Sequence, residues 1–230
     1  MKGSISDKVY KGLRNSIISL KLKPGDEINI NKIAEKLEAS RSPVRDALLK
    51  LEKEGLVEIM PQKGTKVSRI DLERMHEERF LRECLEERTL ELFISQCGDG
   101  DIAHLESILA QQKKSLGEAD TVSFQNHDDE FHRVFFEVAN KKMCWEIIQN
   151  MSGHYRRVRL LNLRNPRVPA NIYTQHLALF EHIRRRDSPR AMELMRQHLS
   201  QIITEEKSLQ EEFPEYFTTR KNPEMIHFLH

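Results

Sequence analysis

Residues 40–67, SRSPVRDALLKLEKEGLVEIMPQKGTKV, decide the fold of the N-terminal part of this 230-residue chain. Ser42 is a residue type that caps helix N-termini, Pro43 suits the first helical position, and Gly55 suits the end of a helix. Between them, apolar side chains recur at helical spacing and predict one buried face, made of Val44, Ala47, Leu48 and Leu51. The stretch therefore begins with a short amphipathic helix.

Two arginines, Arg41 and Arg45, are expected at the exposed N-terminal end of that helix. Guanidinium groups at this end can grip guanine edges or phosphates in a bidentate way. After the helix, the β-rich runs 56–59 and 65–67 are joined by a turn with Lys63 and Gly64, which predicts a basic hairpin. A small helical domain with a solvated basic surface is the alternative, but cap, paired arginines and hairpin together favour a DNA-binding module.

The residues before this stretch predict two more helices. Val9, Leu13, Ile17 and Leu20 form the apolar face of the first, which a Lys23-Pro24-Gly25 turn closes. The second is short and spans 31–37. Three helices within about 50 residues, followed by a hairpin, are the organisation of a winged helix-turn-helix.

Charge is distributed unevenly along the chain. The whole sequence has a net charge of +1, but residues 1–70 hold 15 Lys and Arg against 9 Asp and Glu, a net of +6. The remainder holds 22 against 27, a net of −5. The basic excess thus coincides with the predicted DNA-binding module, as phosphate binding requires.

Length and composition predict two domains, with a DNA-binding domain at 1–70, a helical domain at 71–212 and a C-terminal tail at 213–230. No apolar run approaches membrane-spanning length, and the N-terminus lacks a signal-peptide apolar region. Cys84, Cys97 and Cys144 are widely spaced without a C-x-x-C pair. The cysteines are therefore expected to be reduced thiols, and the protein is expected in the cytoplasm without a membrane partner.

Beyond residue 70 the apolar residues recur every three or four positions, and the expected fold is mostly α. Six helices are predicted, at 71–96, 101–116, 119–139, 142–161, 169–186 and 189–210. Antiparallel packing of such helices gives a bundle, whose interior is a usual place for a ligand or a metal. The tail after Phe213 is expected to dock on the bundle or on a partner subunit, or to fray.

One group of residues in the bundle has metal-ligand chemistry. Asp128 and His132 are one helical turn apart and share a face, while His176 and His198 lie on apolar helix faces. Three imidazoles and one carboxylate suit Zn²⁺, Ni²⁺, Fe²⁺ or Mn²⁺ and leave a position for solvent or ligand. Periodicity alone leaves open an alternative in which each histidine is merely a hydrogen-bonded core residue.

The N-terminal residues resemble the winged helix-turn-helix of GntR-family bacterial transcription regulators. The matching positions are Leu13-Arg14, Pro24-Gly25, Ser40-Arg41, Pro43-Val44-Arg45, Ala47-Leu48, Leu51 and Gly55-Leu56. The sequence departs from the family pattern at Glu38-Ala39 and at Asn31. The DNA contacts expected are Arg14, Arg41, Ser42, Arg45, Lys63, Gly64 and Lys66.

The bundle resembles the FCD ligand-binding domain of the FadR subfamily, and its predicted helix count resembles the shorter, VanR-like variant. The D-x-x-F-H motif of that domain matches Asp128, Phe131 and His132, and its later histidines match His176 and His198. Arg82 and Glu86 resemble its R-x-x-x-E pair. The resemblance implies a homodimer that binds palindromic operators under the control of an organic-acid or sugar-acid effector held beside a metal.

The expected function is therefore a regulator rather than an enzyme. Arg82 would bind the effector carboxylate, or would form an ordinary helix-surface ion pair with Glu86. One alternative makes the metal itself the signal. A helical metalloenzyme is another, but no nucleophile-base pair or phosphate loop accompanies the site. The effector, the operator sequence, the metal and the choice between repression and activation lie beyond what the sequence specifies.

Overall fold

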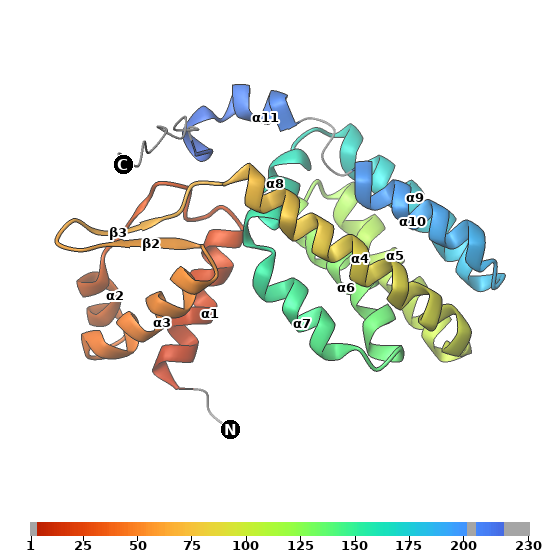
Figure 1. Ribbon diagram of the computed structural model, residues 1–230, viewed down its shortest axis with the longest axis horizontal. Coiled ribbons are helices and arrows are strands. Elements are labelled where there is room, and N and C mark those ends of the chain that lie inside the picture. The colour runs from red at the N-terminus through yellow and green to blue at the C-terminus, as the bar shows by residue number, and fades with distance from the viewer. Residues whose placement is uncertain (1–3, 202–205, 219–230) are drawn as a thin grey trace, which may run out of the picture.

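The computed structural model describes residues 4–201 and 206–218 (Figure 1). Its N-terminal part contains helices α1 (Ile5–Ile18), α2 (Ile30–Lys36) and α3 (Arg41–Lys53). These helices pack around an apolar core of their own, in which Ile17, Val44 and Leu51 are completely buried. The four apolar residues expected on the inner face of α3 are all buried, so the predicted winged helix-turn-helix is confirmed.

Helix α3 begins slightly earlier than expected. Its N-cap is Ser40 rather than Ser42, and Ser40 makes no side-chain capping bond. The backbone of Ser40 is extended, with φ −69° and ψ 166°, which suits a capping position. Pro43 therefore lies within the first turn, where its missing N–H leaves no helical bond unmade.

The wing is a three-stranded antiparallel sheet in the order β1-β3-β2. Strands β2 (Val57–Met60) and β3 (Gly64–Val67) form the predicted hairpin, and the turn between them uses positive φ at Gln62 (63°) and Gly64 (101°). Strand β1 (Glu27–Ile28) was not predicted, because two residues are too short to show an alternating pattern.

The rest of the chain is an all-α bundle of antiparallel helices, as predicted (Figure 1). Its helices are α4 (Leu72–Gln96), α5 (Asp99–Gly117), α6 (Thr121–Val138), α7 (Lys142–Met151), α8 (Gly153–Asn162), α9 (Arg167–Arg184), α10 (Ser188–Gln201) and α11 (Glu206–Glu212). None of the helices within the described ranges is long and apolar enough to cross a membrane. A second apolar core, separate from that of the N-terminal module, fills the bundle.

The single helix predicted at 142–161 is wrong, because the chain breaks at Ser152 into α7 and α8. The carboxylate of Glu78 accepts the backbone N–H groups of His154 and Tyr155, both at 2.9 Å. These are first-turn N–H groups of α8, which have no partner inside their own helix. A carboxylate from α4 therefore stabilises a new helix start that periodicity did not reveal.

The segment after α11 docks on the bundle. Tyr216 and Phe217 are buried in its core, and the N–H of Ile70 donates to the Tyr216 carbonyl at 2.7 Å. This segment therefore packs against Ile70, which lies between the wing and α4. Residues 219–230, including the closing IHFLH, and residues 202–205 of the predicted last helix lie outside the described residues.

Candidate metal centre

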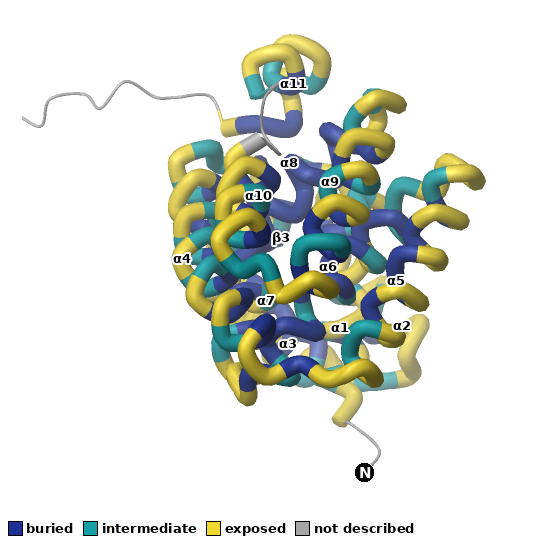
Figure 2. Tube along the Cα trace, turned by 90° about the vertical axis from the view of Figure 1, so that its right-hand side faces the viewer, coloured by how far each residue is buried: buried dark blue, intermediate teal, exposed yellow. Residues whose placement is uncertain are grey.

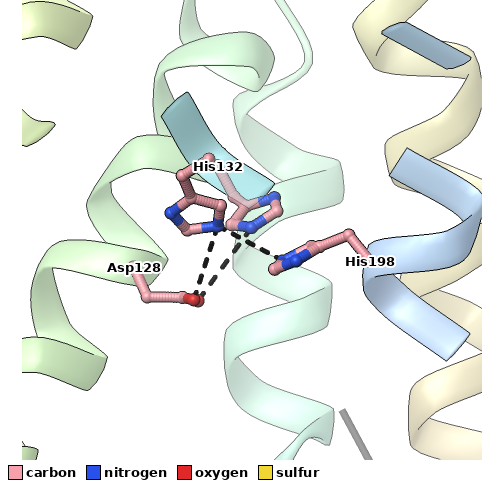
Figure 3. A group of neighbouring side chains, drawn as sticks. Asp128, His132 and His198 are labelled. Carbon is pink, nitrogen blue, oxygen red and sulfur yellow. Dashed lines mark hydrogen bonds and ion pairs between the residues drawn. The ribbon is translucent and has the colours of Figure 1, made fainter. Parts of the chain in front are cut away.

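Asp128 and His132 of α6, His176 of α9 and His198 of α10 converge inside the bundle (Figure 3). One ligand atom from each lies within 4.8 Å of the others, and all four side chains are buried. The sequence prediction named these four residues from spacing and resemblance. The tertiary structure places their ligand atoms around one point.

Three Nε2 atoms surround the Asp128 carboxylate. The Nε2 of His176 lies 3.2 Å from the Nε2 of His198 and 3.6 Å from Oδ1 of Asp128. The Nε2 of His132 lies 4.0 Å from Oδ2 of the same carboxylate. One small cation could therefore contact all four residues after only small side-chain adjustments.

The other ring nitrogen of each histidine faces an oxygen acceptor. The Nδ1 of His132 lies 2.5 Å from Glu86, that of His176 lies 2.9 Å from Gln112, and that of His198 lies 2.8 Å from Gln175. The oxygen of a glutamine amide only accepts, so the Nδ1 atoms of His176 and His198 carry the hydrogen. This arrangement orients the Nε2 lone pairs toward the centre, as the outer partners of metal-bound histidines do.

The facing lone pairs of His176 and His198 need a positive charge between them. With both Nδ1 atoms protonated, two Nε2 acceptors 3.2 Å apart have no hydrogen to share. A divalent cation at the centre would bind both lone pairs and the nearby carboxylate. The donor set therefore fits a metal better than it fits three histidines that merely satisfy one another.

The protonation states of the four residues also favour a metal site. Burial lowers the pKa values of His132 and His176 well below the ordinary value and lowers that of His198 to about 3, so all three are neutral at pH 7. Burial tends to raise the pKa of Asp128, but the Arg159 guanidinium and its other cationic neighbours lower it. Neutral imidazole and ionised carboxylate are the ligand forms that bind a metal.

Two buried arginines border the centre. Arg159 of α8 bonds the Asp128 carboxylate and lies 2.8 Å from Asp129. Arg82 of α4 bonds Glu86 at 2.5 Å and lies 3.8 Å from Asp128 and from Asp129. The expected surface ion pair between Arg82 and Glu86 is thus completely buried, because both side chains face the bundle interior.

A small hollow opens beside Asp128 and Arg159. Its remaining lining is partly apolar and partly amide, from Phe124, Gln125, Asn162, Leu163, Val168 and Ile172. Neither residue spacing nor family resemblance pointed to Arg159, Gln112 or Gln175. Arg159 belongs to GHYRRVRLLN, whose arginines look like an ordinary solvated surface in a sequence, and the two glutamines carry no motif.

Most of the predicted DNA-contacting residues are exposed. Arg41, Ser42 and Arg45 are exposed at the N-terminal end of α3, and Lys63 and Gly64 are exposed at the wing turn. Lys66 lies on β3, partly exposed, with its Nζ 3.6 Å from the carboxylate of Glu27.

Arg14 has different surroundings. Its Nε donates to Glu54 at 2.8 Å, and its Nη2 donates to the backbone carbonyl of Gln149 in α7. The side chain is largely buried between the N-terminal module and the bundle. This placement argues against the predicted DNA contact and makes Arg14 a domain-junction residue.

Comparison with protein families divides the chain in the same way. Residues 5–67 match the model described as bacterial regulatory proteins, gntR family, and residues 79–201 match the FCD domain. The HTH-type transcriptional repressor RspR of Escherichia coli strain K12 is 27% identical over 93% of this chain and 94% of its own. An uncharacterized HTH-type transcriptional regulator of Streptomyces ambofaciens is 31% identical over 92% of this chain and 89% of its own.

Solved structures share the whole architecture. Escherichia coli McbR/YncC superposes with a TM-score of 0.77 at 19% identity, over 92% of this chain and 99% of that chain. A putative transcriptional regulator GntR from Rhodococcus sp. RHA1 also gives a TM-score of 0.77, at 20% identity over 91% and 99% of the two chains. At these identities the likeness concerns the fold.

Proposed function

This chain belongs to the GntR family of DNA-binding transcriptional regulators and carries an FCD domain, and we propose that a divalent metal and a small carboxylate effector in the bundle control its binding to operator DNA. As a regulator of this kind it would act in the bacterial cytoplasm, as a homodimer on a palindromic operator. A two-fold protein axis matches two half-sites of such an operator.

The observation that carries the proposal is the orientation of the three histidines. The Nδ1 atoms of His176 and His198 are hydrogen-bonded to glutamine oxygens, and the Nδ1 of His132 lies beside the Glu86 carboxylate. The Nε2 atoms of His132 and His176 lie 4.0 Å and 3.6 Å from the Asp128 carboxylate, and the Nε2 of His198 lies 3.2 Å from that of His176. Asp128, His132, His176 and His198 would hold Zn²⁺, Ni²⁺, Fe²⁺ or Mn²⁺, and such a donor set leaves coordination positions open. A bound metal would supply a Lewis acid to which a carboxylate can bind.

Arg82 and Arg159 would orient the effector. Both guanidinium groups face carboxylates of the protein at the centre, so an added carboxylate would meet donors that already favour its charge and its planar shape. The hollow beside Arg159 has amide and apolar lining. This lining suits the chemistry of a small organic acid or sugar acid, but the hollow has room for about one water molecule and would have to widen to admit such an acid.

On the DNA side, α3 would lie in the major groove. Arg41, Ser42 and Arg45 would contact bases or phosphates there, and Lys63, Gly64 and Lys66 of the wing would contact the backbone. Arg14 is left out of this set because it is bonded to Glu54 and Gln149.

Metal analysis of the purified protein tests the proposed ligand set. We expect about one equivalent of divalent metal in the wild type, by analogy with mononuclear His and Asp sites, and a large loss of metal in His176→Ala. The matched control is His127→Ala, because His127 lies next to Asp128 on α6 but contacts Ser115 at 3.0 Å instead of the centre. Equal metal content in all three proteins would contradict the ligand set.

A second measurement separates the effector hypothesis from the metal acting alone. The complete burial of the four ligands favours a metal that is held permanently. We therefore expect stabilisation by certain organic acids in a thermal-shift screen, and only with metal present. Operator affinity that responds to metal alone, with no acid giving a shift, would favour the metal as the signal.

A further inference from the structure

Helix α8 is buried on every side, although its sequence GHYRRVRLLN is strongly basic (Figure 2). All ten residues of Gly153–Asn162 are buried, including Arg156, Arg157 and Arg159. Burying charged side chains is costly unless each one finds partners. The partners of these three arginines lie in different parts of the molecule.

The first set of partners begins at the candidate metal centre. Arg159 bonds Asp128 and lies 2.8 Å from Oδ1 of Asp129 through its Nη1 atom. The other oxygen of Asp129 lies 2.8 Å from Nη2 of Arg156, one turn earlier on α8. Two neighbouring carboxylates on α6 thus bind two arginines on α8.

From Arg156 the contacts continue into the N-terminal module. Arg156 donates to the side-chain carbonyl of Gln149, and the backbone carbonyl of Gln149 accepts a hydrogen bond from Arg14 of α1. Arg14 also bonds Glu54, which follows α3, at 2.8 Å. A continuous series of polar contacts therefore joins the ligand Asp128 to the helices of the DNA-binding module.

A second connection runs through Arg157. Its Nη1 donates to the backbone carbonyl of Ser68 at 2.7 Å, and the Ser68 hydroxyl donates to the Gly55 carbonyl at 2.5 Å. Ser68 follows the wing and Gly55 follows α3. Arg157 therefore bonds α8 to the residue that follows the wing and, through Ser68, to the residue that follows the C-cap of α3.

The backbone of α8 also touches this module directly. A Cβ atom added to Gly153 would lie only 2.6 Å from Cδ2 of Leu56, which is buried in the core of the DNA-binding module. Because the helix start packs this closely, a displacement of α8 along its axis would press on the module or leave a gap beside it.

We propose that α8 couples the occupancy of the candidate metal centre to the position of the DNA-binding module, with Arg156 and Arg157 as positioning residues. The inference rests on the proposed metal site. Asp128 serves both the metal and Arg159, so occupancy changes the charge that Arg159 faces. Arg159, Asp129 and Arg156 must then rearrange together, because each buried charge depends on the next.

Hydrogen exchange of the full chain, with Zn²⁺ alone or with chelator, tests the coupling. Zinc should slow exchange in peptides from α6, α9 and α10, which carry the proposed ligands. If α8 couples the two regions, zinc should also slow exchange in peptides from α7, α8 and α1, at least about fivefold, the lower end of typical coupling between sites. Slowing confined to α6, α9 and α10 would overturn the proposal.

Two variants identify the route, because Arg156→Gln removes the link to Asp129 and Gln149→Ala removes the side chain that Arg156 bonds. Both should keep the zinc effect in α9 and α10, which shows that the fold and the metal site are intact, and both should lose it in α1. The control is Arg186→Gln. Arg186 bonds the carbonyls of Ile94 and Cys97 at the C-terminal end of α4 and takes no part in the described contacts between α8 and the DNA-binding module.

The outcomes distinguish this inference from the function on which it rests. A zinc effect in α1 that survives in both variants would overturn the role of Arg156. An equal loss in Arg186→Gln would overturn the specific route, because any lost arginine would then suffice. No slowing anywhere in the wild type would overturn the proposed metal site itself, and the coupling with it.

Discussion

Helices α3 and α8 are both short and rich in arginine, but they present their arginines to opposite environments. Arg41 and Arg45 of α3 are exposed, whereas Arg156, Arg157 and Arg159 of α8 are buried against carboxylates and carbonyls. An exposed guanidinium is available to a phosphate or a base. A buried guanidinium instead fixes the positions of the groups around it, so the same residue type serves recognition in one helix and connection in the other.

The largest expected effect is on stability and concerns the buried arginines of α8. Arg159→Met leaves the buried Asp128 without its main cationic partner and removes one of the two closest arginines of Asp129, so we expect a loss of about 3–5 kcal/mol in the free energy of unfolding. Arg45→Met is the matched control on the exposed side, where about 0.5 kcal/mol or less is expected. Urea denaturation of the metal-free proteins measures both, and similar losses would contradict the assignment of burial.

On the exposed side, the expected effect is on operator binding and not on stability. Arg45→Ala should weaken binding by about 1–3 kcal/mol, as the loss of a bidentate contact does, without changing stability. Lys53→Ala at the other end of α3 is exposed as well and serves as the control. The measurement is fluorescence anisotropy with a duplex selected from a random library by the wild-type protein. Unchanged binding of Arg45→Ala would refute its role in recognition.

The next effect concerns packing between the start of α8 and the DNA-binding module. Gly153→Ala should destabilise the protein by about 1–3 kcal/mol, because the new methyl group overlaps Leu56 in a close-packed contact. Gly12→Ala on α1 meets nothing within 4 Å and should be neutral or stabilising by about 0.5–1 kcal/mol. Thermal unfolding compares them, and the prediction fails if both substitutions act alike.

The smallest expected effect concerns pH. Burial and the neighbouring Arg157 lower the pKa of His154 from 6.5 to about 2, while its Nδ1 accepts the Asp71 N–H at 2.9 Å. The unfolded chain binds a proton at this residue below pH 6.5, whereas the folded chain does so only near pH 2. The free energy of unfolding therefore falls as the pH drops from 6.5 toward 2. His154→Asn should reduce the slope by up to about 1.4 kcal/mol per pH unit.

Unfolding of the metal-free protein between pH 7 and pH 5 measures this slope. The exposed His104 provides the control, and His104→Asn should leave the slope nearly unchanged. A wild-type slope in His154→Asn would show that His154 gains its proton in the folded state as readily as in the unfolded chain.

Much of the fold follows from local patterns. The inner face of α3, the hairpin and most bundle helices were predicted, because each rests on periodicity within one segment. The break at Ser152 was missed because it depends on Glu78, which lies 76 residues away from the N–H group of His154 that it accepts. The cap at Ser40 was missed because a second serine, Ser42, lies two residues later and suits an N-cap equally well.

The residues of the candidate site also differ in how far the sequence predicts them. Asp128 and His132 share a helix turn, so their pairing is a property of the sequence. The convergence of His176 and His198 with them, at 3.2 Å between two ring nitrogens, requires three helices to pack. Gln112 and Gln175 could not be predicted, since a glutamine that orients a histidine looks in the sequence like any surface glutamine.

The winged helix, the helical bundle and the residue types that could bind DNA or a metal are predictable from residue spacing, because each depends on a pattern within one element. Which arginines are buried, and which groups they join, depends on how distant elements pack. Arg159 meets Asp128 across 31 residues and Arg157 meets Ser68 across 89. A polar side chain enters a core only when a distant partner compensates its lost hydration, and that partner is absent from its local sequence.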